Sequence, residues 1–204
     1  MTGTRRIPTQ ERSRRTVERI VDAGATVLAA GGYHEASTNR IAEAAGVSPG
    51  TLYGYFADKD EIVAAVIERV VDGFAEAVAP AMRAAAGRPV EEATRVVLDA
   101  VLAGVEARAE LIEAFVDRVP AERYAPRVDA LRERVSDVSY HLVAASLPAA
   151  SPADLERAVW MAVRTVEHLT VRYALIRPPV PRDAFLDDLT AMIVGLAPTG
   201  PPAP

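Results

Sequence analysis

Residues 33–61 read YHEASTNRIAEAAGVSPGTLYGYFADKDE and decide the fold of the N-terminal part of the chain. Thr38 is a residue type that caps helices, and it precedes a run with helical spacing of apolar residues. Gly46 supplies a turn, where a positive φ costs little only for glycine. Ser48 and Pro49 suit the cap and the first residue of a second helix. The pattern predicts a helix-turn-helix.

The second of these helices is expected to span about eight residues and to have two distinct faces. Leu52 and Phe56 are four residues apart and point inward together, while Gly50, Thr51 and Gly54 lie on the opposite side. Two glycines in a helix cost about 1 kcal/mol each relative to alanine. Close approach of the backbone to another surface would offset that cost. A DNA major groove admits such a helix, and Thr51 would then reach the base edges.

Lys59 falls in the first turn of the next predicted helix, which begins at Asp58 as its cap. The helix macrodipole disfavours a cation at that end by about 0.3–1 kcal/mol, so a nearby anion is expected. Two interpretations stay open at this point. The anion is either a DNA phosphate or a neighbouring carboxylate of Asp58, Asp60 or Glu61.

The run G-V-S-P-G-T-L-Y-G-Y-F-A-D-K-D-E at residues 46–61 resembles the DNA-binding signature of the tetracycline-repressor (TetR) family of bacterial regulators. Residues 38–42, T-N-R-I-A, continue the match, which is close over residues 10–62 and extends to the rest only in helical pattern and length. Gly54 departs from the family, in which a larger residue is common, so sequence preference would depend more on DNA shape. The DNA-binding residues that this reading implies are Thr38, Asn39, Arg40, Ser48, Pro49, Gly50, Thr51, Tyr53, Tyr55 and Lys59.

Charge is distributed unevenly along a chain whose net charge is −5. Residues 1–56 carry seven Arg against five acidic residues, whereas the other 148 residues carry 16 basic against 23 acidic ones. A basic end on an acidic body is expected if that end approaches phosphate. Arg5 and Arg6 would then enter a minor groove, although a solvated, disordered basic tail explains the same charges.

The amino-acid composition argues against disulfides, metal sites and membrane spans. Half of the 204 residues are apolar and a quarter are charged, which is typical of a globular protein. The chain has no Cys and three scattered His, so we expect no disulfide, no metal site and no cofactor. No window resembles a membrane span and no apolar stretch follows the basic N-terminus. We therefore expect the protein to stay in the cytoplasm.

Helical spacing punctuated by Pro and Gly predicts an all-α fold of about nine helices. Beyond the helix-turn-helix, the expected helices include residues 90–107, 109–118, 121–146, 152–177 and 182–196. Four segments follow from this pattern and from the resemblance. They are a flexible basic arm (1–9), a helix-turn-helix DNA-binding domain (10–57), a helical ligand-binding and dimerisation domain (58–197) and a disordered tail (198–204).

The second half of the chain contains a helix, residues 152–177, with apolar residues on two faces, which indicates burial on two sides. The resemblance implies a twofold dimer formed by residues 152–196 and a small-molecule pocket among the middle helices. An apolar lining favours a lipophilic or aromatic effector. Ordinary surface, core or dimer packing is the simpler explanation of the candidate lining residues named next. The candidate lining residues are Phe115, Tyr140, His141, Trp160, Arg164 and His168.

Three classes of function compete on the sequence alone. The leading hypothesis is a ligand-responsive dimeric transcriptional regulator, most simply a repressor of a palindromic operator. The second is a helical-bundle enzyme or carrier, for which the chain shows no G-x-S-x-G, H-E-x-x-H or nucleotide-binding glycine loop. The third is a protein-interaction module. Salt-dependent binding to duplex DNA separates the first from the other two.

Overall fold

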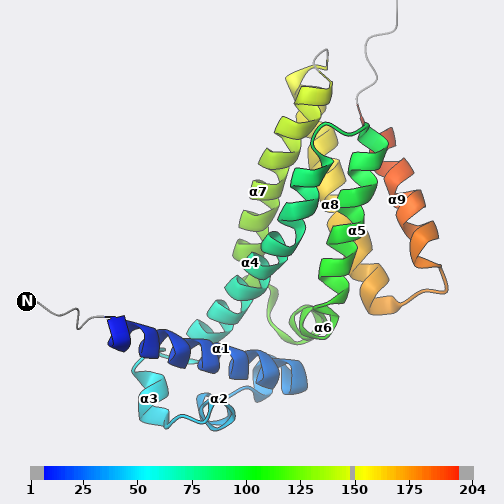
Figure 1. Cartoon of the computed structure of the whole chain (residues 1–204). Helices are drawn as coiled ribbons and strands as arrows, with labels where there is room; N and C mark the ends of the chain where they lie inside the picture. The colour runs from blue at the N-terminus through cyan, green and yellow to red at the C-terminus, as the bar shows by residue number, and fades with distance from the viewer. Residues whose placement is uncertain (1–6, 148–149, 198–204) are drawn as a thin grey trace, which may run out of the picture. The chain divides into compact units, whose positions relative to one another are not determined.

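The computed structural model describes residues 7–147 and 150–197, and this part of the chain contains helices and no strand. The expected all-α class with about nine helices is confirmed for these residues (Figure 1). The helices are α1 (Ile7–Glu35), α2 (Thr38–Ala45), α3 (Pro49–Tyr53), α4 (Lys59–Ala85), α5 (Val90–Glu106), α6 (Ala109–Arg118), α7 (Ala121–Ser146), α8 (Pro152–Ile176) and α9 (Arg182–Gly195).

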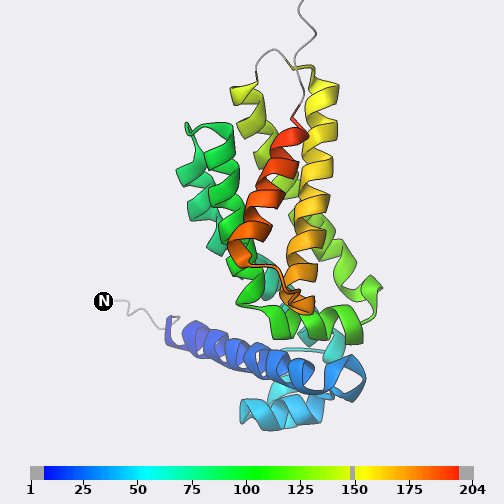
Figure 2. The same cartoon turned by 90° about the vertical axis from the view of Figure 1, so that its right-hand side faces the viewer.

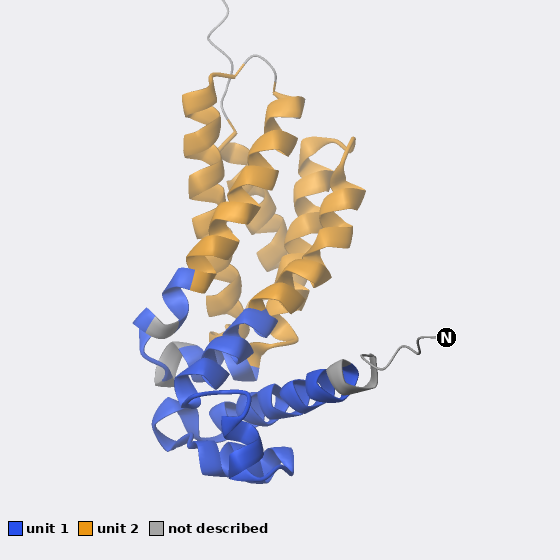
Figure 3. Cartoon of the chain, turned by 90° about the vertical axis from the view of Figure 1, so that its left-hand side faces the viewer, with its two compact units in different colours: residues 1–70, 110–126 blue, residues 71–109, 127–204 orange. Residues whose placement is uncertain are grey.

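The chain divides into two compact units (Figure 3). Unit 1 comprises residues 1–70 and 110–126, and unit 2 comprises residues 71–109 and 127–204. The division differs from the boundary expected after residue 57, because α4 is one continuous helix that both units share. Helix α1 begins at Ile7, inside the segment expected as a flexible arm. The rest of that arm and the tail from residue 198 lie outside the described residues.

Local signals account for most of the helix ends. Ser151 caps α8 by accepting a hydrogen bond from the backbone N–H of Asp154, and a proline follows it at the first helical position. Gly32, with φ 71°, interrupts the regular geometry of α1 near the end that the sequence predicts. The last turn of α1 is thereby redirected before the helix ends at Glu35.

The core of unit 1 is formed by side chains that α1, α2, α3 and α4 contribute. Its innermost members, each with no exposed surface, are Ile20, Leu28, Ile41, Leu52 and Ile62. Burying such a side chain contributes about 1.5–3 kcal/mol. A Cβ at Gly24 of α1 would lie 2.8 Å from the Ile62 side chain, so this approach of α1 to α4 requires glycine.

In unit 2 the core joins α5, α8 and α9, and Figure 2 shows α8 and α9 side by side. Leu98 and Leu102 of α5 pack with Leu186 and Leu189 of α9, and partly buried residues of α8 cover them. The ring of Tyr173 on α8 stacks on Phe185 of α9 with centroids 4.1 Å apart.

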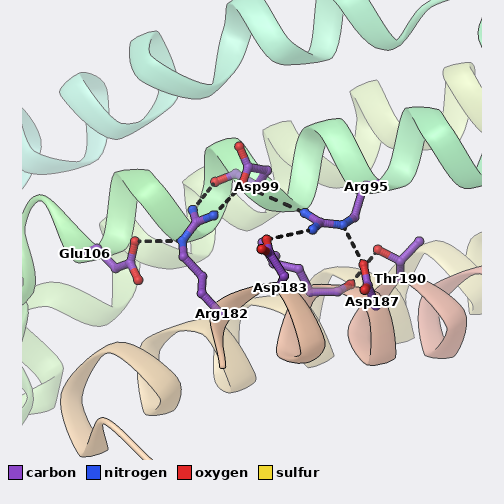
Figure 4. A network of polar contacts seen from close by, with 8 residues as sticks. Arg95, Asp99, Glu106, Arg182, Asp183, Asp187 and Thr190 are labelled. Carbon is purple, nitrogen blue, oxygen red and sulfur yellow. Dashed lines mark hydrogen bonds and ion pairs between the residues drawn. The ribbon is translucent and has the colours of Figure 1, made fainter. Parts of the chain in front are cut away.

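A network of ion pairs covers the seam between α5 and α9 (Figure 4). Arg95 of α5 bonds Asp183 at 3.2 Å and Asp187 at 3.0 Å. Arg182 of α9 in turn bonds two carboxylates of α5, that of Asp99 at 2.5 Å and that of Glu106 at 3.3 Å. The contact with Asp99 is the largest cause that raises the pKa of Arg182 above its ordinary value. These partly exposed pairs are screened by water, so each contributes about 1 kcal/mol at most.

Candidate nucleic-acid interface

Helix α2 is capped by Ser37, not by Thr38 as the sequence suggested. The Ser37 hydroxyl accepts a hydrogen bond from the backbone N–H of Arg40 at 3.3 Å, and its φ and ψ are extended. Thr38 is the first helical residue, and its hydroxyl lies 3.0 Å from the hydroxyl of Tyr53 in α3. The two short helices of the motif are therefore joined by a bond between side chains at their exposed edge.

The turn between α2 and α3 has the geometry that the sequence predicts. Gly46 adopts φ 63° and ψ 39°, and the N–H groups of Gly46 and Val47 donate to the carbonyls of Glu43 and Ala42, each at 3.0 Å. These bonds form a Schellman motif, which satisfies the last carbonyls of α2.

Arg19 of α1 adds a contact to this turn that the sequence analysis missed. Its guanidinium donates to the carbonyl of Ala45 and, at 3.1 Å, to that of Gly46. A Cβ at Gly46 would lie 3.1 Å from the same guanidinium nitrogen. The positive φ favours glycine at this position, and a Cβ there would also require the Arg19 guanidinium to shift by a few tenths of an ångström. No local pattern indicates this contact, since 26 residues separate Arg19 from Ala45.

Helix α3 is shorter than the expected eight residues. Ser48 caps it by accepting from the Thr51 N–H at 3.1 Å, as predicted. After Tyr53 the chain turns, and the Gly54 N–H is shared between the carbonyls of Gly50 and Thr51, each at 3.2 Å. Leu52 is fully buried, and Phe56, beyond the end of the helix, is 9% exposed. The predicted inward pair is confirmed even though the helix does not reach Phe56.

The outward residues of α2 and α3 form an exposed surface. Tyr53 and Tyr55 expose 54% and 39% of their area, which is unusual for aromatic side chains in a folded protein. The Thr51 hydroxyl lies 2.8 Å from that of Ser48, so its position is fixed by the cap. We call this surface the reading face. Its exposed members are Asn39, Arg40, Ser48, Pro49, Gly50, Thr51, Tyr53 and Tyr55, with the half-exposed Thr38 at its edge.

Arg40 is restrained before any ligand binds. Its guanidinium donates to the backbone carbonyl of Glu35 at 3.0 Å and lies 3.4 Å from the carboxylate of the same residue. Both side chains stay largely exposed to solvent. The pair orients Arg40 without burying its charge.

Lys59 finds partners other than the two anions considered from the sequence. Its ammonium donates to the carbonyls of Tyr33 at 3.1 Å and Ala36 at 3.5 Å, and it lies 4.0 Å from the centre of the Tyr33 ring. Carbonyls at the end of α1 carry partial negative charge, which offsets the unfavourable dipole of α4. Two of the three ammonium protons are engaged in this way. The predicted cap Asp58 is confirmed, because its carboxylate accepts from the Glu61 N–H at 3.0 Å.

The six candidate ligand residues are divided between the two units. Phe115 of α6 is 7% exposed and belongs to unit 1, while the other five belong to unit 2. On α7, Tyr140 is half-buried and His141 is exposed, with their rings edge to face. The other three, Trp160, Arg164 and His168, share an exposed face of α8, and Trp160 exposes 60% of its area. The expectation that they line a small-molecule pocket among the middle helices stays a prediction.

A charged cluster between α7 and α8 was not foreseen. Arg132 of α7 makes two bonds of 2.5 Å to the carboxylate of Glu167 on α8 and another to Asp129. The bond to Glu167 is the main cause that raises the pKa of Arg132 above its ordinary value. Thirty-five residues separate the partners, so helical spacing alone does not reveal the pair.

The described residues contain neither a candidate metal site nor a candidate membrane span. No group of three or more His, Asp or Glu side chains there is placed to hold a metal ion. No helix there is long and apolar enough to cross a bilayer.

The fold and the exposed helix-turn-helix together define a DNA-binding protein of the helix-turn-helix class. Residues 20–66 match the family profile described as bacterial regulatory proteins, tetR family. Residues 89–196, more than half of the chain, match that of the tetracyclin repressor-like C-terminal domain. The chain belongs to the TetR family, whose members are transcription regulators and not enzymes. The resemblance noted in the sequence is thereby confirmed.

Individual relatives agree with this assignment. The fatty acid metabolism regulator protein of Bacillus subtilis is 39% identical over 57 residues, which are 28% of this chain and 29% of that protein. The transcriptional activator FasR of Mycolicibacterium smegmatis is 37% identical over 78 residues, covering 38% and 34%. This chain therefore matches about a third of the length of these curated relatives. A TetR-like regulator from Rhodococcus sp. RHA1 superposes with a TM-score of 0.68 and 28% identity, covering 90% and 97%.

Proposed function

We propose that the reading face binds duplex DNA in the major groove and that the protein regulates transcription from that operator. The observation that carries this proposal is a short, capped helix whose backbone at Gly50 is exposed beside two exposed tyrosines. Pro49, Gly50 and Thr51 would face base edges, and Asn39 and Arg40 would reach bases or backbone. Phosphates would be bound by Thr38, Ser48, Tyr53, Tyr55 and the third ammonium proton of Lys59.

The working unit in this proposal is a homodimer formed through residues 152–196. Large apolar side chains stay exposed on the helices concerned, namely Trp160 at 60%, Ile176 at 63% and Met192 at 50%. A second copy would cover them, as exposed apolar patches favour association. A twofold dimer presents two reading faces about one DNA turn apart, so the operator would be a palindrome.

A small effector would act on the helices of unit 2 and release the DNA, which makes the protein a repressor. Because Trp160, Arg164 and His168 lie on the exposed face of α8, we assign them to the dimer contact and not to the effector pocket. Tyr140 and His141 of unit 2 stay candidates for the effector, whose proposed chemistry is apolar or aromatic, whereas Phe115 is buried within unit 1. Acting on the chromosome requires the protein to be in the cytoplasm.

The test is selection of an operator from random duplex DNA, followed by anisotropy titrations over a range of salt concentrations. We expect one palindromic site, bound by two chains or a multiple of two, with an affinity that falls steeply with salt. Thr51→Ala should relax base preference at one position by about 1–3 kcal/mol. Tyr55→Phe should instead weaken binding to all sequences alike.

Matched controls are Thr94→Ala, whose hydroxyl bonds a carbonyl of its own helix, and Tyr124→Phe on α7. Neither should alter the selected sequence or the affinity for it. Binding that stays weak and indifferent to sequence at low salt would contradict the proposal and favour the carrier or interaction-module alternatives.

A further inference from the structure

Arg40 of α2 is held by Glu35, the last residue of α1, through one end of its guanidinium. The terminal nitrogen Nη1 donates to the Glu35 carbonyl at 3.0 Å and lies 3.4 Å from the Glu35 carboxylate oxygen Oε2. Among the contacts described, the other terminal nitrogen, Nη2, and Nε bond no protein atom. The guanidinium therefore presents the planar edge formed by Nη2 and Nε to a ligand.

The place of the Glu35 carboxylate is set by the end of α1. Gly32, with φ 71°, redirects the last turn of this helix. The Glu35 side chain lies over Gly31, where a Cβ would be 3.0 Å from Oε2 and 3.1 Å from the Glu35 Cβ. A side chain at residue 31 would thus require Glu35 to shift. All of these residues belong to unit 1.

The carboxylate decides which DNA group suits the available edge of Arg40. The Nη2–Nε edge fits two acceptors side by side, which are either two phosphate oxygens or O6 and N7 of a guanine in the major groove. A phosphate would bring a second negative charge close to the Glu35 carboxylate, and the two anions would repel each other. A guanine edge is neutral and avoids this repulsion. The pair therefore favours a guanine base over the DNA backbone.

We propose that Glu35 is a specificity-determining residue, which holds Arg40 for a guanine of the operator and weakens the contact of Arg40 with phosphate on any other DNA. The inference rests on the function proposed above, and it selects bases over the backbone as the target of Arg40. The side chains of Glu35 and Arg40 expose 68% and 51% of their area. An exposed pair of this kind changes binding by about fivefold at most.

The test compares Glu35→Gln with the wild-type chain on the selected operator and on a random-sequence duplex of the same length. Glutamine keeps the shape and an acceptor oxygen but removes the charge. Affinity for the random duplex should rise about fivefold, and its logarithm should fall more steeply with log salt by about one, because Arg40 gains a phosphate. Affinity for the operator should change by about twofold or less, so the ratio of the two affinities falls.

Glu43→Gln is the matched control, because Glu43 is an exposed acidic residue on the same helix as Arg40 and does not bond it among the contacts described. It removes the same charge from unit 1 and should leave the ratio unchanged. In a chain that already carries Arg40→Gln, Glu35→Gln should have no further effect, since it acts through Arg40. Equal effects of Glu35→Gln and Glu43→Gln, or an effect that persists without Arg40, would indicate general repulsion of DNA and overturn the inference.

The base is located by replacing the operator guanines one at a time with 7-deazaguanine, which lacks the N7 acceptor. At one guanine in each half-site, this change should weaken wild-type binding about tenfold and leave the binding of Arg40→Gln unchanged. The inference is wrong if no guanine behaves in this way, or if Arg40→Gln lowers affinity for the operator and the random duplex alike. The second result would identify Arg40 as a phosphate contact.

Failure of this inference is distinguishable from failure of the proposed function. A wild-type chain that selects no operator overturns both. A wild-type chain that selects an operator, with the same affinity ratio in Glu35→Gln, overturns this inference alone.

Discussion

The helix-turn-helix and the α5–α9 seam hold their helices with cations, but they give those cations different partners. Around the helix-turn-helix, Arg19 and Lys59 bind backbone carbonyls. Across the seam, Arg95 and Arg182 bind carboxylates (Figure 4).

The difference matters because a carbonyl is neutral and a carboxylate is not. A guanidinium on a carboxylate is neutralised at a distance, whereas one on a carbonyl keeps its full charge toward the surroundings. Arg19 and Lys59 therefore have a structural role without losing the positive potential that DNA would meet, whereas Arg40 of the same region is paired with the Glu35 carboxylate. In the seam no such potential is needed, and four carboxylates surround the two guanidiniums.

The largest expected effect on stability comes from truncating one large buried side chain in the core of each unit. Leu52→Ala in unit 1 and Leu102→Ala in unit 2 each remove a side chain with no exposed surface. Each should lower the free energy of unfolding by about 3 kcal/mol, measured by urea denaturation. Only Leu52→Ala should also abolish binding to a single DNA half-site. Equal loss of half-site binding in both variants would contradict the proposal that unit 1 alone contacts the half-site.

A smaller effect is expected at the two turn glycines, Gly46 with φ 63° and Gly87 with φ 78°. Gly46→Val should cost about 2 kcal/mol, since valine is strained at positive φ. Gly87→Val serves as the control, because a Cβ there meets nothing within 4 Å. Gly87→Val introduces backbone strain without a steric contact. Any greater loss of stability in Gly46→Val therefore measures the displacement of the Arg19 guanidinium. Identical losses would show that the Arg19 contact contributes nothing.

The two kinds of cation contact should respond differently to salt. Arg19→Gln and Arg182→Gln should each lower the free energy of unfolding by about 1 kcal/mol at low salt. The contact with Asp99 raises the pKa of Arg182, so this side chain is charged at neutral pH and both variants can be compared there. The effect of Arg182→Gln should shrink in about 1 M salt, because the ion pair is screened. That of Arg19→Gln should persist, and a parallel decline would contradict the comparison.

The smallest effect is expected at the start of α8. The Ser151 hydroxyl bonds Asp154 and, with the Arg157 guanidinium, lowers the pKa of Asp154 below its ordinary value of 3.8. A lowered pKa stabilises the fold above pH 3.8, and this contribution is lost as the pH falls through the lowered value. Asp154→Asn should therefore melt slightly below wild type at pH 7 and together with it in strong acid. A gap that persists in acid would exclude the charge as its cause.

The fold was predictable from sequence because its helix ends are marked locally. Ser48, Asp58 and Ser151 cap the helices that were expected to follow them, and Gly46 adopts the predicted left-handed conformation. The error at α3 has a local reason too. Backbone bonds through Gly54 turn the chain after Tyr53, although the spacing of Leu52 and Phe56 suits a longer helix.

The contacts that fix the site could not be predicted in the same way. The sequence predicted that Lys59 needs a negative partner but not that backbone carbonyls of α1 supply it. Arg95 and Asp187 are 92 residues apart, and no periodicity connects them. A helical wheel placed Trp160 on a second apolar face of α8, but only the packed structure shows that this face is exposed. Such contacts depend on how helices pack, which helical periodicity does not encode.

The cap of α3 also bears on how such a protein can change over evolution. The residues that hold the helix-turn-helix in shape, Ser37, Gly46, Ser48 and Leu52, act through the backbone or the core. Most exposed residues beside them, such as Tyr55, contribute little to the stability of the motif. Side chains on the reading face other than the cap Ser48 and the bonded pair Thr38 and Tyr53 can therefore be exchanged without refolding the motif, and a duplicated copy of the gene is free to acquire a different DNA target.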